Sequence, residues 1–161
     1  ILSATYADEP RNGIGPLQAQ ETIVLRPPFV RAAEIGDVRY IGTAPDTVAD
    51  GTERLVATAY ADGAYLYFGP TDLTGVERVR ASLRSLGHPL TLELRAGGPE
   101  GKLIASQAIQ APKGRWIEAV VPVRDAGEHD LYLVLRSQAE GLGQWNPLVR
   151  ADLIRFERAG R

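Results

Sequence analysis

The sequence predicts an all-β chain that folds as an antiparallel sandwich of two β-sheets. Apolar residues recur at every second position in several short segments, which is the period of a strand with one buried face. Glycine, proline, aspartate or asparagine bounds each segment, and these residues favour turns. Regular strands without convincing helices are typical of sandwiches, and the residues alone leave an immunoglobulin-like arrangement and a jelly roll open. The alternating segments are Ala64-Leu66-Phe68, Val79-Ala81-Leu83, Leu90-Leu92-Leu94, Ile117-Ala119-Val121-Val123 and Leu131-Leu133-Leu135.

A helix competes with a strand in the segment from Gly75 to Leu86. Val76, Val79 and Leu83 recur at three- and four-residue spacing, which a helix would also bury on one face. Alternation from Val79 to Leu83 fits a strand equally well, and the next strand follows after only a Gly-His-Pro turn, as in a hairpin. We therefore predict a strand here.

The chain is expected to consist of an N-terminal arm, residues 1–28, and a sandwich domain, residues 29–161. Residues 1–21 contain several Pro, Gly and Asn and show little periodicity, which predicts an irregular arm. Residues 22–25, TIVL, could form a short edge strand before Pro27 and Pro28 end it. A length of 161 residues suits one domain with a single core, and because methionine is absent we expect a chain processed or excised from a longer one.

Composition argues against two kinds of partner. The formal net charge is -2, with Lys+Arg 18 against interspersed Asp+Glu 20, so we expect no nucleic acid to be bound. No apolar run approaches the length of about 18 residues that a membrane span needs. The absence of cysteine excludes disulfides and thiolate chemistry but does not fix the compartment.

Catalysis by this chain is not expected. His88 and His129 both lie in turn segments, where a solvated side chain is more common than a catalytic base. The acidic residues show no spacing that marks a pair across a cleft, and no glycine-rich phosphate loop opens a helix.

Several aromatic residues lie on the phase opposite to the predicted core. Tyr65, Tyr67 and Tyr132 alternate with buried positions, while Trp116 precedes Ile117 at the start of a strand. Aromatic rings beside polar groups suit pyranose sugars, whose C–H faces are apolar and whose edges carry hydroxyls. The alternative is that these rings pack across strands or under the N-terminal arm. Two further candidates for ligand contact are Tyr60, in a turn, and Trp145, in a glycine-rich loop that could equally cover one end of the sandwich.

A hard cation is a further possibility. Glu34, Asp37 and Glu157 lie near opposite ends of the domain, and oxygen ligands from first and last strands can clamp Ca²⁺. A second acidic group, residues 46–53, lacks the full spacing of an EF-hand loop, and solvated loop carboxylates are the simpler interpretation.

The domain resembles family 6 carbohydrate-binding modules and their family 35 relatives. The resemblance rests on five stretches in order: FVRAAEIGD, DGAYLYFGPTDLTGVERV, LTLELRAGGPEGKLIAS, GRWIEAVVPVRDAGEHDLYLVL and ADLIRFER. It implies a β-jelly roll that binds saccharides at loops on one end, with a possible second site on a concave sheet face, and a structural Ca²⁺. Residues 4–28, ATYADEPRNGIGPLQAQETIVLRPP, resemble the lead-in to such modules at the C-terminus of large secreted bacterial oxidoreductases with haem c or quinone-dependent domains.

The resemblance also implies roles for particular residues. Trp116 matches the family's tryptophan in a Gly-Trp loop, and Tyr60 is the nearest aromatic to the family's early-loop position. Asp152 stands where the family has asparagine, and a carboxylate accepts hydrogen bonds but cannot donate as an amide does. For calcium, Glu34 and Glu157 match two family positions, whereas Ala32 replaces another acidic ligand.

These observations together predict a non-catalytic carbohydrate-binding module. We expect it to be secreted or periplasmic and to tether an attached catalytic domain to polysaccharide or oligosaccharide. The alternative is a structural module that packs between domains and has lost its ligand. In a binding module Trp116 should be exposed beside Tyr60, whereas in a packing module it should be covered.

Overall fold

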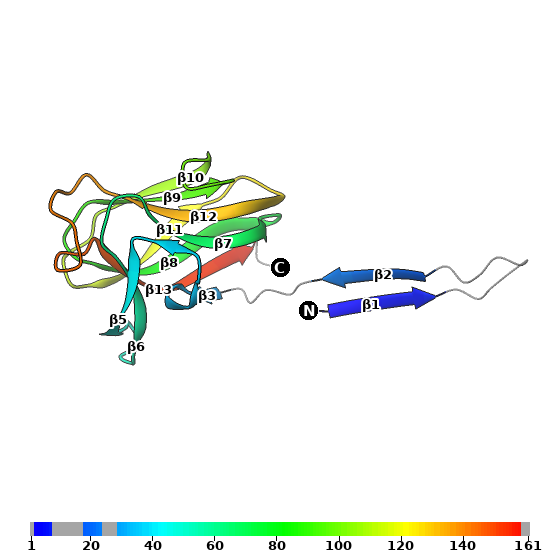
Figure 1. The fold of residues 1–161 in the computed structure, drawn as a ribbon, viewed down its shortest axis with the longest axis horizontal. Coiled ribbons are helices and arrows are strands. Elements are labelled where there is room, and N and C mark those ends of the chain that lie inside the picture. Colours follow the sequence, from blue (N-terminus) through cyan, green and yellow to red (C-terminus); the bar gives the residue numbers. More distant parts are fainter. Residues whose placement is uncertain (1, 8–17, 24–28, 159–161) are drawn as a thin grey trace, which may run out of the picture.

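The structure is a computed structural model that describes residues 2–7, 18–23 and 29–158. Its strands run β1 to β13 along the chain, with one short 3-10 helix, η1, from Ala32 to Glu34 (Figure 1). The strands are β1 Leu2–Ala7, β2 Gln18–Ile23, β3 Phe29–Arg31, β4 Val38–Arg39, β5 Ile41–Thr47, β6 Glu53–Ala59, β7 Ala64–Asp72, β8 Val76–Ser85, β9 Leu90–Ala96, β10 Lys102–Ile109, β11 Trp116–Pro122, β12 Glu128–Arg136 and β13 Val149–Arg158.

Two antiparallel sheets form the sandwich, as the sequence predicts. One has the strand order β10-β9-β12-β7-β4, and the other has the order β11-β8-β13-β6-β5, with β3 paired to β13. Neighbours in the sheets are often distant in sequence, since β8 lies between β11 and β13. This mixing of early and late strands is what a jelly roll requires.

The core lies between the sheets and is built from the predicted alternating positions. Leu66, Val79, Leu94 and Leu133 are at most 1% exposed, and each belongs to one of the alternating segments. The segment from Val76 to Ser85 is strand β8, so the choice of strand over helix there is confirmed. Val79, Ala81, Leu83 and Ser85 are buried while Arg80 and Arg84 between them are half-buried, so the period of two prevails, with Ser82 as the one further buried position.

The N-terminal arm is more ordered than the sequence predicts. β1 and β2 pair as an antiparallel ladder in which Leu2 lies opposite Ile23 and Ala7 opposite Gln18. The expectation of an irregular segment over residues 1–21 is therefore wrong for Leu2–Ala7 and for residues 18–21. The expected edge strand over residues 22–25 is present to Ile23, and the remainder of that segment lies outside the described residues.

In the described part of the chain, no helix is long and apolar enough to cross a membrane.

Candidate functional site

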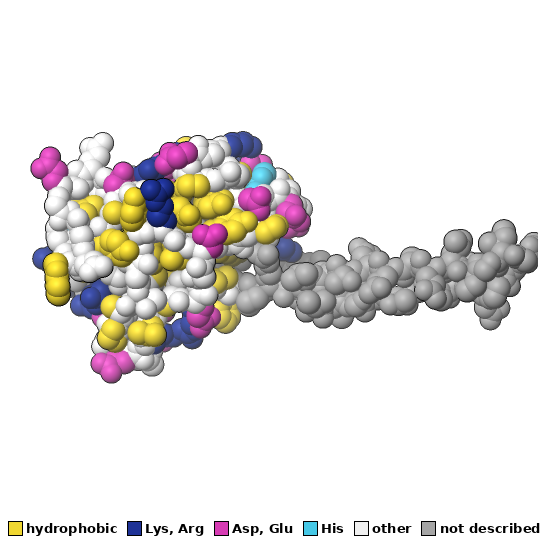
Figure 2. Space-filling model, in the orientation of Figure 1, with side chains coloured by type: hydrophobic (Ala, Val, Ile, Leu, Met, Phe, Trp, Pro, Cys, Tyr) yellow, Lys and Arg dark blue, Asp and Glu magenta, His cyan; other side chains and the backbone are white. Residues whose placement is uncertain are grey.

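Three tyrosines gather on the outer face of the five-stranded sheet. Tyr65 and Tyr67 alternate along β7, and Tyr132 of β12 lies directly opposite Tyr67. The rings of Tyr67 and Tyr132 stack with centroids 4.5 Å apart, and Tyr65 meets Tyr132 edge-on at 5.4 Å. Figure 2 shows apolar side chains gathered where β7 and β12 run in Figure 1, with acidic and basic side chains among them. We call Tyr65, Tyr67 and Tyr132 the tyrosine cluster.

Neighbouring side chains pack around the tyrosine cluster, but part of each ring remains exposed to solvent. Val134 shares its face, lies opposite Tyr65 and is fully buried, so neighbouring side chains cover it. The three tyrosines themselves are only half-buried. The Tyr67 hydroxyl donates to Asp130 Oδ1 at 3.0 Å, and this bond, with desolvation, raises the pKa of Tyr67. Desolvation likewise raises the pKa of Tyr132, so both phenols are neutral hydrogen-bonding groups at ordinary pH.

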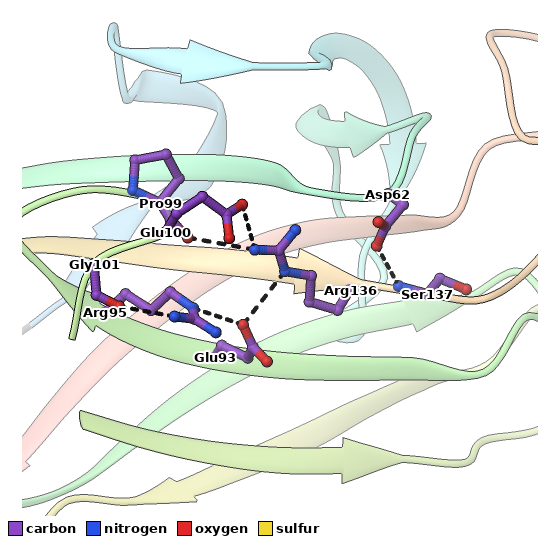
Figure 3. Close-up of polar contacts among 8 residues, drawn as sticks. All are labelled: Asp62, Glu93, Arg95, Pro99, Glu100, Gly101, Arg136 and Ser137. Carbon is purple, nitrogen blue, oxygen red and sulfur yellow. Dashed lines mark hydrogen bonds and ion pairs between the residues drawn. The ribbon is translucent and has the colours of Figure 1, made fainter. Parts of the chain in front are cut away.

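Charged residues continue the same face beyond the tyrosines. Glu93 Oε2 accepts from Arg95 Nε at 2.7 Å and from Arg136 Nε at 3.4 Å (Figure 3). Arg136 also donates through Nη2 to Glu100 Oε1 at 2.5 Å, and that bond lowers the pKa of Glu100. Arg95 is further held by Gly101, whose carbonyl oxygen lies 2.8 Å from Nη1. The two arginines are therefore fixed in place by several bonds each.

A groove of about 560 Å³ opens at the Arg136 end of this face. Apolar atoms form most of its exposed wall, with polar side chains among them, and Ser137 is held there by its backbone N–H, which donates to Asp62 Oδ1 at 2.8 Å (Figure 3). Gly63 approaches Arg136 closely, because a Cβ built on it would lie 3.1 Å from Arg136 Nη1. The lining residues are Asp62, Pro89, Leu90, Thr91, Glu93, Ala108, Ile109, Gln110, Arg136, Ser137, Gln138 and Ala139.

Trp116, expected as an exposed platform, is half-buried beside the β5–β6 hairpin. Its indole Nε1 donates to the carbonyl oxygen of Thr47 at 2.8 Å. Gly114, with φ of 80°, makes the turn that starts β11, and its N–H donates to the Ser85 carbonyl oxygen at 2.7 Å. The tryptophan does lie on the face opposite Ile117 and Ala119, as predicted. Its indole N–H, however, is already hydrogen-bonded to the β5–β6 hairpin of the same chain.

The other expected contact residues are distributed around the molecule. Tyr60 lies edge-on to Tyr40, with ring centroids 6.5 Å apart. Tyr40 has a φ of 55°, an uncommon conformation for an aromatic residue, and nothing in the sequence indicates it. Trp145 is 99% exposed at a loop whose neighbouring Asn146 bonds to the Gly141 carbonyl oxygen.

Asp152 is enclosed by arginines. It is 7% exposed, and its Oδ1 lies 3.6 Å from Arg54 Nε and 3.8 Å from Arg31 Nη1. Its negative charge is thus balanced within the chain. That it receives a sugar hydroxyl stays a prediction, and the geometry offers it little support.

The residues expected to hold calcium fit that ion poorly. Glu34 lies 3.7 Å from Arg31, and Glu157 accepts from Arg78 at 2.6 Å and lies 2.7 Å from Arg80. Among the described residues, no group of three or more acidic, histidine or cysteine side chains could hold a metal ion. Two guanidinium groups on one carboxylate compete directly with a dication.

We therefore expect saturating calcium to leave the melting temperature unchanged. Binding to the folded state alone would raise the melting temperature by mass action, so differential scanning fluorimetry with CaCl₂ and with EDTA compares the two cases. A rise that EDTA reverses would show that a calcium site exists after all.

Ion pairs of this kind make the fold sensitive to acid. Arg80 and Arg78 lower the pKa of Glu157, and bonds from Thr52 and Arg54 lower the pKa of Asp50 to about 2. Each folded-state pKa lies below the unfolded value of about 4, so the stabilisation is complete above that value and is lost as the pH falls through the folded pKa.

The free energy of unfolding should consequently decline between about pH 4 and pH 2 and change little just above pH 5. Urea unfolding at several pH values measures this, with Asp50→Asn expected to make the decline shallower. If the free energy of unfolding of Asp50→Asn falls with pH as steeply as that of the parent, Asp50 does not contribute to the acid sensitivity.

Sequence reasoning found part of this site and missed the rest. Tyr65 and Tyr67 were expected to face outward, and the structure confirms that arrangement. Glu93 and Arg136 share the phase of Tyr132, which could have indicated them, but only the pairing of β9 with β12 brings them together. That pairing joins segments about 40 residues apart, and no local pattern predicts it.

Similar folds are found among solved structures, but not through sequence comparison. No protein-family model matches the sequence, and no curated protein matches it. Among solved structures, a family 6 carbohydrate-binding module from Clostridium cellulolyticum in complex with xylose is similar with a TM-score of 0.66 and 21% identity, covering 81% of this chain and 96% of that one. A β-1,3-glucan-binding family 6 module from Bacillus halodurans gives 0.65 and 20%, covering 81% and 95%.

A larger enzyme contains a similar region. A glycoside hydrolase family 43 arabinoxylan arabinofuranohydrolase from Bacillus subtilis, in complex with cellotetraose, gives a TM-score of 0.72 at 22% identity. The match covers 92% of this chain but only 30% of that enzyme. The chain therefore has the jelly-roll fold of family 6 carbohydrate-binding modules.

Proposed function

We propose that this chain is a non-catalytic carbohydrate-binding module whose glycan lies along the outer face of the five-stranded sheet. The fold supports this, because modules with the same fold were solved with xylose or are described as binding β-1,3-glucan. The observation that carries the proposal is the continuity between the tyrosine cluster and the groove at Arg136.

The dimensions of this surface suit an oligosaccharide. Tyr132, Val134 and Arg136 share one face of β12, so the first and last are separated by about 13 Å at about 3.3 Å per residue. That span exceeds one sugar ring. A glycan here would cover the tyrosine rings with its C–H faces and extend its hydroxyls into the groove.

The groove supplies fixed partners for hydroxyls. Within the part of the chain that the structure describes, Glu93 Oε1 and Asp62 Oδ2 have no hydrogen bond, while the second oxygen of each carboxylate is already occupied. Because arginines and a backbone N–H hold both carboxylates in position, a ligand would lose little free energy in ordering them.

The charges favour binding over hydrolysis. A glycosidase needs a carboxylic acid that stays protonated, which requires a raised pKa beside a second carboxylate. Arg136 instead lowers the pKa of Glu100, and it also contacts Glu93. Arginine-paired carboxylates suit recognition of hydroxyls, not donation of a proton.

We further propose that the module tethers an attached catalytic domain to extracellular or periplasmic polysaccharide. The arabinofuranohydrolase supports this, since a region like this chain forms 30% of that enzyme. Tethering raises the effective concentration of the catalytic domain at its substrate.

A packing module is the second candidate, and the bond between Trp116 and Thr47 favours it. In that case the tyrosine cluster would contact another domain of the parent chain. The geometry supports binding better, because the groove is concave and combines apolar surface with polar side chains.

Affinity gel electrophoresis tests the proposal. The chain should be retarded in native gels that contain xylan, soluble β-glucan or another neutral polysaccharide, relative to a non-binding marker. Unchanged mobility across a broad polysaccharide panel would favour the packing module instead.

A further inference from the structure

The β1–β2 ladder of the N-terminal arm is a sheet of two strands only. Leu2–Ala7 pairs with Gln18–Ile23, and among the described residues neither strand pairs with a strand of the sandwich. An isolated two-stranded ladder is marginally stable at best in water, and a further strand or a packed face is needed to stabilise it. We therefore expect a partner outside the sandwich to complete the ladder.

The register gives this ladder one apolar face and one polar face. Directly opposite residues of an antiparallel ladder share a face, and successive residues alternate between the two faces. One face has Leu2, Ala4, Tyr6, Ala19 and Ile23 with a single charged position, Glu21, and the other has Ser3, Thr5, Ala7, Gln18, Gln20 and Thr22. This pattern is typical of a sheet that packs on a core through one face and meets water with the other.

The similar solved structures differ in whether their match includes the arm. The isolated family 6 modules from Clostridium cellulolyticum and Bacillus halodurans match 81% of this chain, a share that residues 29–161 can supply alone. The arabinofuranohydrolase matches 92%, which residues 29–161 cannot supply, so its match extends into the first 28 residues. Most of that enzyme lies outside the match, which covers 30% of its length. Part of the arm therefore has a structural counterpart in a larger enzyme.

Only five residues separate the ladder from the sandwich. Residues 24–28 connect Ile23 to Phe29, the first residue of β3. Since a chain spans at most about 3.5 Å per residue, the ladder ends within roughly 20 Å of β3. A domain that included the ladder would therefore be held close to the module, in contrast to a domain at the end of a long flexible linker.

We propose that the β1–β2 ladder is an interdomain docking element that extends a β-sheet of a preceding domain in the same parent chain. One outer strand of the ladder adds to the exposed edge of that sheet through main-chain hydrogen bonds, and the apolar face of the ladder packs on the core of that domain. The arabinofuranohydrolase match favours this partner over a second copy of the chain, because there the counterpart of the arm belongs to one longer chain.

This docking element would determine how the module is attached. A ladder built into the preceding domain fixes the module beside it, so the glycan-binding face is held at short range from that domain. The inference rests on the proposed attachment to another domain and does not depend on glycan binding.

Hydrogen exchange followed by mass spectrometry tests the docking directly. In the 161-residue chain, the amides of Leu2–Ala7 and Gln18–Ile23 should be protected less than about tenfold, while those of β8 are strongly protected. In the longer parent chain the same amides should gain about 100-fold or more in protection. Strong protection in the 161-residue chain, or equally weak protection in both proteins, would overturn the proposal.

Proline at the centre of β1 tests the contribution of the main chain. Thr5→Pro removes an N–H and is poorly tolerated inside a sheet, so in the parent chain it should lower the melting temperature of the preceding domain by about 5 °C or more. Thr5→Val, which keeps the N–H and favours a strand, is the matched control and should cause no such loss. An unaltered transition in Thr5→Pro would contradict the docking element.

The same variant in the 161-residue chain tests the alternative partners. Thr5→Pro should leave its melting temperature unchanged, because the sandwich core lies between strands that begin at residue 29. Light scattering should show a monomer. A lower melting temperature would mean that the ladder packs on its own sandwich, and a dimer that Thr5→Pro dissociates would mean that it pairs with a second copy. Either result would overturn the proposal.

These measurements involve no glycan and so separate the two proposals. A chain that bound no polysaccharide but gave the expected exchange results would refute the glycan site and support the docking element. A chain that bound glycan while its ladder was strongly protected without a preceding domain would do the reverse.

Discussion

Replacing Tyr132 with alanine is expected to remove most glycan binding. Tyr132 is the central ring of the tyrosine cluster, since it contacts both Tyr65 and Tyr67. Its loss removes one stacking surface for the glycan and also removes the ring against which Tyr65 and Tyr67 pack. Truncating a central aromatic anchor costs about 2 kcal/mol or more, equivalent to roughly a thirtyfold loss of affinity. Isothermal titration with the best polysaccharide from the gel panel measures it.

Trp145→Ala is the matched control for this prediction. Trp145 is a large aromatic residue that is 99% exposed, so its removal should not disturb the fold. We expect affinity in this variant to remain within about twofold of the parent. If Trp145→Ala lost binding and Tyr132→Ala kept it, the glycan would bind at the loop, where the sequence also allowed it.

Leu133→Ala is expected to have the largest effect on stability. Leu133 is next to Tyr132 in β12 but points into the core, where it is 1% exposed. Deleting a buried leucine side chain costs about 2–5 kcal/mol because a cavity remains. For a chain of this size that lowers the melting temperature by roughly 4–20 °C.

The pair of variants at neighbouring positions distinguishes the two faces of β12. Urea unfolding should show a much smaller loss for Tyr132→Ala, because Tyr132 is half-buried on the outer face. Comparable losses would mean that Tyr132 is mainly a packing residue. The tyrosine cluster would then belong to the fold and not to a binding site.

Much of the fold could be predicted from the period of apolar residues. The side chains of Leu131, Leu133 and Leu135 are buried on one phase of β12, as alternation requires, and the same period correctly chose a strand for Val76–Ser85. The N-terminal arm was harder to predict. Leu2–Ala7 and Gln18–Ile23 pair with one another, and such pairing depends on a partner strand more than on local pattern.

The candidate site was less accessible to sequence reasoning. Alternation placed Tyr65 and Tyr67 outward, and that is local information. Trp116 was expected to be free because its strand did not need it, yet a carbonyl from residue 47 accepts its indole N–H. Contacts over such separations depend on how the hairpin folds back, which neither composition nor spacing encodes.

A titration followed by nuclear magnetic resonance tests the central claim most directly. With ¹⁵N-labelled chain and a neutral oligosaccharide from the best-binding polysaccharide, the backbone amide signals of Tyr65, Tyr67, Tyr132, Glu93 and Arg136 should shift together along a single saturating curve. Amides of β8 and β11, on the opposite sheet, should stay in place. Shifts confined to β11 and the β5–β6 hairpin, with those five residues unmoved, would contradict a glycan site on the five-stranded sheet.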